Sequence, residues 1–100
     1  MNIKLRRDPY GIPHIETESE HDAWYAMGYA SAEDRLWQME WYRRRGTGRW
    51  SEVVGPEGIE ADRLFRRFRL DDASKVDAKN LSHETRRMFD SYSDGVNAFV

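Results

Sequence analysis

The stretch RDPYGIPHIETESEHDAWYAMGYASAEDRLWQME, residues 7–40, decides how this chain folds. Its beginning has the composition of a β-turn, since Asp8 can open a turn, Pro9 presets φ and Gly11 tolerates a positive φ. Short alternating segments flank that turn on both sides, whereas the later part has the spacing of a helix. We therefore expect a strand pair over residues 1–17 and helices over residues 18–100, in a single mainly α segment with an N-terminal β-hairpin.

The first half of the long helix has a start signal and a side of small residues. Ser19 followed by Asp22 resembles a capping box, which predicts a helix from about His21. Gly28 lies on one face of that helix, with small residues beside it at Ala23, Ala26 and Ala30. A side made of such small residues allows the backbone of another element to approach closely.

The second half of this helix is apolar around most of its circumference. At about 100° per residue, the apolar positions cover well over half of the circle; they are Tyr29, Ala32, Leu36, Trp37, Met39, Trp41 and Tyr42. A helix of this kind is buried by neighbours on several sides. Glu40 can pair with Arg43 or Arg44, three and four residues later. Gly46 is the expected C′ residue, where the helix ends.

Three further helical segments follow. The sequence SEVVG, residues 51–55, predicts one short helical turn. Residues 56–70 form an amphipathic pattern with apolar positions at Ala61, Leu64, Phe65 and Phe68. Ser82 is the expected cap of a last helix, whose apolar stripe is Met88, Phe89, Tyr92, Val96 and Phe99. That helix reaches Val100 without a stop signal, so we expect the chain to be cut inside a larger fold.

Composition excludes several classes of protein. The chain is 39% hydrophobic and 13% aromatic, which argues against disorder. A formal net charge of -2 gives no electrostatic reason to bind nucleic acid or an anionic membrane. Cysteine is absent, which excludes disulfides and thiolate metal sites. The start, MNIKLRRDPYG, lacks the apolar region of a signal peptide, so we expect a cytoplasmic protein or one whose leader has been removed.

The residues that could carry chemistry form no recognisable site. The histidines, His14, His21 and His83, have spacings that fit no compact metal motif. No serine stands in a G-x-S-x-G elbow. The arginine runs at 43–45 and 66–69 are interleaved with acids, which favours ion pairs over phosphate binding. We assign no catalytic residue and no metal ligand, and the substrate-binding residues stay unassigned. One open alternative is a stand-alone helical interaction module that associates with itself.

An ordered set of motifs runs through the whole chain. The set consists of Arg7-Asp8, Gly11–Ile15, Gly28-Tyr29, Asp34–Glu40, Arg43-Arg44, Gly48, Glu52–Gly55 and Tyr92–Ala98. In this order and spacing it resembles the amino-terminal part of the α chain of the penicillin acylase family, the N-terminal nucleophile hydrolases. No single motif carries the resemblance, which depends on the order of all of them.

The resemblance implies a fragment of a four-layer αββα sandwich, built from an α and a β chain that are cut from one precursor by autoproteolysis. It implies hydrolysis of linear amides, such as β-lactam side-chain amides or acyl-homoserine lactones. The nucleophile would be a serine at the start of the β chain, so this chain alone should be inactive. No cofactor is expected in this segment, because the family's structural calcium binds outside it.

The expected partners are the remainder of the α chain, the β chain and a small amide substrate, with no nucleic acid and no membrane. The same resemblance implies that Asp34, Arg35 and Glu40 fix internal contacts through hydrogen-bonded pairs.

Overall fold

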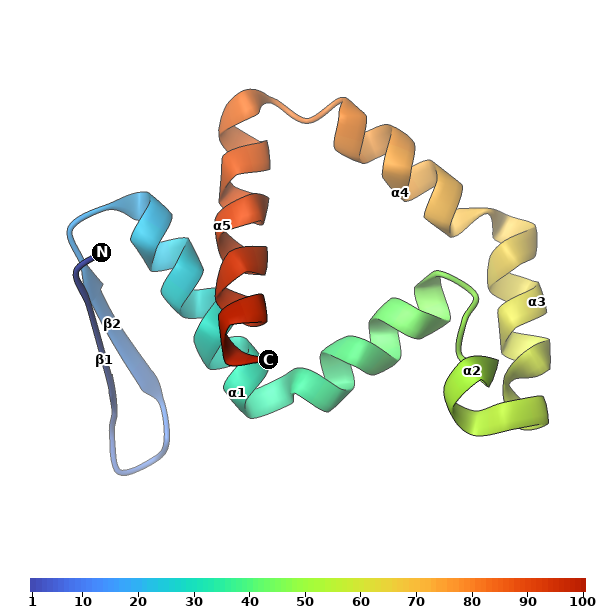
Figure 1. Ribbon diagram of the computed structural model, residues 1–100, viewed down its shortest axis with the longest axis horizontal. Helices are drawn as coiled ribbons and strands as arrows, with labels where there is room; N and C mark the ends of the chain where they lie inside the picture. The colour runs from blue at the N-terminus through green and yellow to red at the C-terminus, as the bar shows by residue number, and fades with distance from the viewer. The chain divides into compact units, whose positions relative to one another are not determined.

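The computed structural model describes all residues from 1 to 100 and consists of a β-hairpin followed by helices (Figure 1). The elements in chain order are β1 (Ile3–Arg7), β2 (Pro13–Thr17), α1 (Glu20–Gly46), α2 (Ser51–Val54), the 3-10 helix η1 (Gly55–Gly58), α3 (Ile59–Phe68), α4 (Leu70–Lys79) and α5 (His83–Phe99). This confirms the predicted mainly helical fold with an N-terminal hairpin. By its internal contacts the chain divides into unit 1, residues 1–36 and 82–100, and unit 2, residues 37–81.

The hairpin of unit 1 closes through the predicted turn. Strands β1 and β2 pair antiparallel, with Ile3 opposite Thr17 and Arg7 opposite Pro13. The Asp8 carboxylate accepts hydrogen bonds from the backbone N–H groups of Tyr10 and Ile12, at 2.8 and 3.0 Å. Gly11 has φ +79°, in the region that favours glycine.

Helix α1 begins at the predicted cap and bends where no bend was expected. The Ser19 hydroxyl accepts a hydrogen bond from the backbone N–H of Asp22 at 3.1 Å, which confirms the cap. Arg35 has non-helical angles, φ −137° and ψ 25°, inside the 27-residue span. The kink falls beside the boundary between the two units.

The end of α1 corrects one prediction. The C′ residue is Gly48, with φ +70°, and not Gly46, which is the last residue of the helix. The backbone N–H of Gly48 donates to the carbonyl of Arg45 at 3.1 Å, and that of Arg49 to the carbonyl of Arg44 at 2.8 Å. These two bonds are the Schellman pattern, which satisfies carbonyls left free at a helix end. With two glycines so close together, the turn geometry and not residue type decides which one ends the helix.

Helices α1 and α5 of unit 1 meet backbone against backbone. A Cβ atom on Gly28 would overlap the carbonyl oxygen of Tyr92, and one on Gly95 would overlap that of Tyr25. The ring of Tyr29 lies edge-on against Phe99, with 5.6 Å between centroids. This confirms that the small-residue side of α1 admits another backbone.

Large apolar side chains contribute little to the buried core. The buried hydrophobic residues are Ala26, Ala30 and Ala32, while Trp37 is 63% and Tyr42 is 62% exposed. These 100 residues therefore leave Trp37 and Tyr42 in the aromatic half of α1 largely uncovered, and cover from other parts stays a prediction. No helix here is both long enough and apolar enough to cross a membrane.

In unit 2 the structure subdivides a predicted helix. The amphipathic pattern over residues 56–70 forms η1 and α3, and the helix ends at Arg69, which has φ +54°. Helix α4 follows directly and contains no buried residue. The last helix, α5 in unit 1, starts as predicted, because the Ser82 hydroxyl accepts a hydrogen bond from the N–H of Thr85 at 3.1 Å.

Candidate functional site

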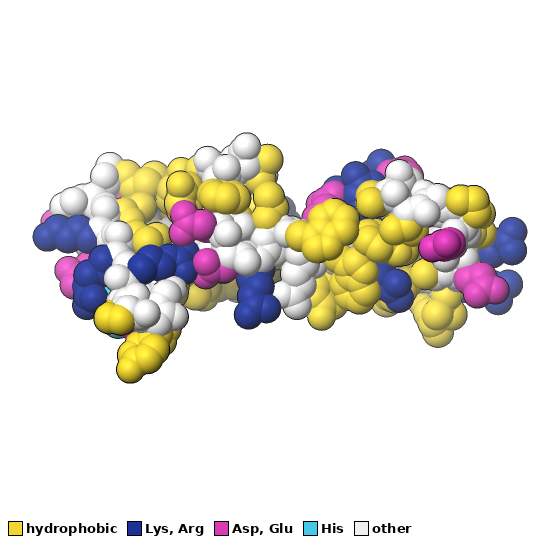
Figure 2. Space-filling model, turned by 90° about the horizontal axis from the view of Figure 1, so that it is seen from below, with side chains coloured by type: hydrophobic (Ala, Val, Ile, Leu, Met, Phe, Trp, Pro, Cys, Tyr) yellow, Lys and Arg dark blue, Asp and Glu magenta, His cyan; other side chains and the backbone are white.

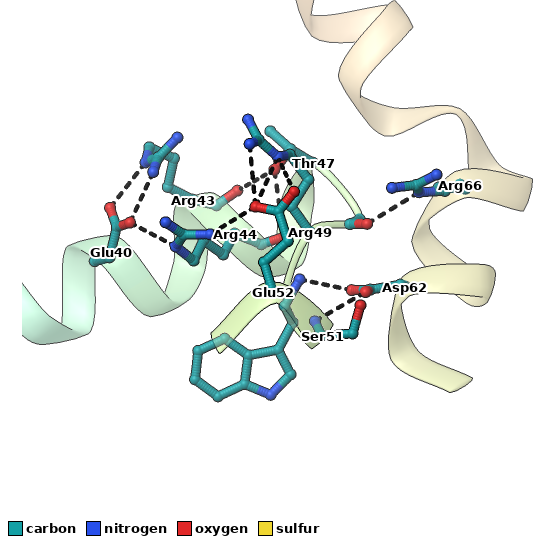
Figure 3. Close-up of polar contacts among 11 residues, drawn as sticks. Glu40, Arg43, Arg44, Thr47, Arg49, Ser51, Glu52, Asp62 and Arg66 are labelled. Atoms are coloured by element: carbon teal, nitrogen blue, oxygen red, sulfur yellow. Dashed lines mark hydrogen bonds and ion pairs between the residues drawn. The ribbon is translucent and has the colours of Figure 1, made fainter. Parts of the chain in front are cut away.

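The largest polar assembly is an ion-pair network in unit 2, formed by Glu40, Arg43, Arg44, Arg49 and Glu52 (Figure 3). Glu40 accepts two hydrogen bonds from Arg43, at 2.7 and 2.8 Å, and one from Arg44 at 2.7 Å. Arg44 also donates to Glu52 at 2.9 Å, and Arg49 donates to the same carboxylate at 3.0 Å. The predicted pairing of Glu40 with the following arginines is therefore confirmed.

The network holds its acids in the ionised form. Hydrogen bonds from Arg43 and then Arg44 lower the pKa of Glu40 to about 2. A hydrogen bond from Arg49 lowers the pKa of Glu52 as well. A general acid needs a pKa near the working pH, so these carboxylates suit ion pairing and not proton transfer at neutral pH.

Asp62 holds the start of α2 from helix α3. The residue is only 6% exposed, and its carboxylate accepts hydrogen bonds from the backbone N–H groups of Trp50, at 2.7 Å, and Ser51, at 2.9 Å. Burial raises the pKa of Asp62, but hydrogen bonds from the Ser51 side chain and from both backbone groups outweigh burial and leave the pKa lowered. One turn later, Arg66 donates to the carbonyl of Gly48 at 2.9 Å. No local sequence pattern indicates this clamp, because Asp62 caps a helix that lies earlier in the chain.

Aromatic rings lie close to one another next to the start of α2. The ring of Trp50 lies 6.1 Å from that of Trp37 and 6.3 Å from that of Trp41, between centroids. The Arg45 guanidinium lies 4.7 Å from the Trp41 centroid and 5.6 Å from that of Phe65. Cation–π contacts of this kind accommodate a charge among aromatic side chains.

In unit 1, ion pairs fasten the hairpin to α1. Arg7 donates to Glu33 at 2.6 Å and to Asp34 at 2.8 Å. The hydrogen bond with Asp34 is the main cause that raises the pKa of Arg7 above its ordinary value. Asp34 thus makes an internal contact of the expected kind, while Arg35 occupies the kink of α1.

The three histidines belong to no cluster of side chains that could hold a metal ion. His14 Nε2 lies 2.9 Å from Asp8 Oδ2, and this contact is the main cause that lowers the pKa of Asp8. His21 and His83 line a hollow of about 380 Å³ in unit 1, together with Glu20, Trp24, Glu84, Arg87, Met88 and Ser91. No group of three or more His, Asp or Glu side chains is arranged to hold a metal ion.

Three serine side chains form hydrogen bonds with backbone groups. Ser19 and Ser82 cap α1 and α5, and the buried Ser91 donates to the carbonyl of Arg87 at 2.7 Å. These roles are structural. The assignment of no catalytic residue to this chain stays a prediction.

Known proteins similar to this chain cover nearly all of it. The penicillin amidase family model matches residues 2–100. The acyl-homoserine lactone acylase QuiP of Pseudomonas aeruginosa is 42% identical over 100% of this chain and 12% of its own length. The penicillin acylase 2 proenzyme of Pseudomonas sp. strain SE83 is 43% identical over 98% of this chain and 13% of its own length.

A solved structure shows the same fold. A thermostable penicillin G acylase from Alcaligenes faecalis matches with a TM-score of 0.86 and 33% identity, over 98% of this chain and 52% of that chain. The chain spans about an eighth of the curated relatives that it matches. With the family model matching residues 2–100, this chain belongs to the penicillin amidase family.

Proposed function

We propose that the protein carrying these residues hydrolyses linear amides, of the β-lactam side-chain or acyl-homoserine lactone type. The observation that carries the proposal is the family match over residues 2–100, from one end of the motif set to the other. Relatives that share this segment are named as penicillin acylases and as acyl-homoserine lactone acylases. The choice between these two substrate classes depends on residues outside this segment.

In this proposal the chain is part of the framework of the enzyme and supplies no nucleophile. The carboxylates of Glu40, Glu52 and Asp62 are engaged by arginines or backbone N–H groups, which supports a structural role. The nucleophile is the serine that starts a β chain, and its own amine serves as the base. The partners are the remainder of the α chain and that β chain, and any calcium ion binds outside these residues.

The test compares the complete protein with residues 1–100 alone, on a phenylacetyl and a fatty-acyl chromogenic amide. We expect turnover by the complete protein on at least one amide and none by the 100-residue chain, because a missing nucleophile removes the covalent route. Turnover by residues 1–100 above the buffer rate would contradict the site assignment. A complete, processed protein that is inert toward both amides would contradict the proposed activity.

A second candidate is a stand-alone helical interaction module. The exposure of Trp37 and Tyr42 favours it, because exposed aromatic side chains are common at protein interfaces. Light scattering on residues 1–100 separates the two candidates. A discrete oligomer with a cooperative melt supports the module, whereas aggregation or partial folding supports the enzyme segment.

A further inference from the structure

Helix α3 is anchored to its own unit by polar side chains and presents apolar side chains to solvent. Asp62 and Arg66 contact the backbone of residues 48–51. Leu64 and Phe68, in contrast, are 50% and 66% exposed. Each of these two lies two residues from Arg66, which places it about 160° around the helix from that anchor. Leu64 and Phe68 are one turn apart and lie on the same side of α3, where they form a ridge.

This orientation covers only part of the apolar stripe of α3, because Ala61 and Phe65 are half-buried while Leu64 and Phe68 are exposed. A surface helix normally turns its apolar stripe toward the core and its charges toward water. Rotating α3 to hide Leu64 and Phe68 would withdraw the Asp62 carboxylate from the N–H groups of Trp50 and Ser51. Backbone donors left without a partner in a buried place are costly, so the clamp holds Leu64 and Phe68 outward. Figure 2 shows one face of the molecule, on which yellow hydrophobic side chains lie exposed among charged ones.

We infer that the ridge of Leu64 and Phe68 is a docking surface for the rest of the acylase polypeptide, an inference that rests on the proposed function. The relatives' lengths identify the occupant, since the segment is 12% of QuiP and 13% of the penicillin acylase 2 proenzyme. The solved acylase chain contains nearly as much polypeptide outside the matched region as within it. An exposed Leu–Phe pair at i,i+4 spacing suits an apolar helix or sheet face of that remainder.

Hydroxyl-radical labelling of the complete protein, read by mass spectrometry, tests the inference directly. We expect labelling of Phe68 to fall about fivefold or more between the urea-unfolded and the folded protein, because a covered side chain reacts only when it opens. Equal labelling of Phe68 in both states would overturn the inference. Protection that disappears on dilution would also overturn it, because the occupant would then be a second copy of the chain.

A matched pair of variants adds a second measurement on the complete protein. Leu64→Gln with Phe68→Gln should lower the unfolding temperature clearly, because glutamine cannot replace the apolar contacts of a docked ridge. Arg63→Gln with Arg67→Gln changes two exposed residues at the same spacing on the same helix and should have little effect. Equal effects of the two pairs would contradict docking.

Labelling and unfolding do not depend on amide hydrolysis, so this inference and the proposed function fail separately. A protein with a protected Phe68 but no turnover contradicts only the proposed activity. A protein with turnover but a fully reactive Phe68 contradicts only the docking surface.

Discussion

Each of the two units is held together internally by a different kind of contact. Unit 1 depends on direct contact between two helix backbones, at Gly28 and Gly95. Unit 2 depends on side chains that reach across, in the ion-pair network and in the clamp of Asp62. Backbone atoms cannot move aside without shifting a whole helix, whereas a long side chain can change its rotamer. We therefore expect unit 1 to tolerate substitution at its contact far less than unit 2.

The largest effect is expected from Gly95→Ala. The new methyl group would overlap the carbonyl oxygen of Tyr25, so the helices must separate, at a cost of about 3 kcal/mol or more. Urea unfolding followed by circular dichroism measures this cost. Gly46→Ala is the control, because a Cβ there meets nothing within 4 Å and should be neutral or stabilising by about 0.5 kcal/mol. Similar midpoints for the two variants would show that the helices are not in backbone contact.

An intermediate effect is expected from Asp62→Ala. The substitution leaves two backbone N–H groups without their charged acceptor, which should cost about 2–3 kcal/mol of unfolding free energy. Because the pKa of Asp62 is lowered in the folded state, its contribution is present above the unfolded pKa and is lost as the pH falls through the folded pKa. The exposed Asp77→Ala on α4 is the control. A loss no greater than that of the control would exclude the clamp.

The smallest effect is expected from Glu40→Gln. Its partners can find water when the charge is removed, so the loss at neutral pH should be about 1 kcal/mol. The folded pKa of about 2 lies below the ordinary value of 4.5, so the stabilisation is present above 4.5 and is lost as the pH falls toward 2. The urea midpoint of the variant should therefore depend less steeply on pH over this range. An unchanged dependence of the urea midpoint on pH would mean that Arg43 and Arg44 do not lower the pKa of Glu40.

Features with a local chemical cause were predictable from the sequence. The turn at Asp8 and the caps at Ser19 and Ser82 depend on neighbours within four residues, and the structure confirms all three. The pairing of Glu40 with Arg43 and Arg44 follows from helical spacing alone. The small-residue side around Gly28 was also visible, although its partner was not.

Features that depend on distant residues were not predictable. Gly95 reads as an ordinary glycine inside a helix until Tyr25 is seen against it. The role of Asp62 depends on N–H groups 11 and 12 residues earlier in the chain, with no spacing rule that connects them. No proline or glycine lies next to the kink at Arg35, so the sequence does not predict it. For a candidate site the limit is the same, since single residue types do not show which groups converge.

The position of Trp50 has a consequence for spectroscopy. Of the four tryptophans, Trp37, Trp41 and Trp50 form one cluster in unit 2, and Trp24 belongs to unit 1. Three of the four indole emitters in residues 1–100 therefore report on unit 2, where Asp62 holds the backbone of Trp50. Separation of α1 from α5 at Gly28 and Gly95, in unit 1, would change the indole emission spectrum little.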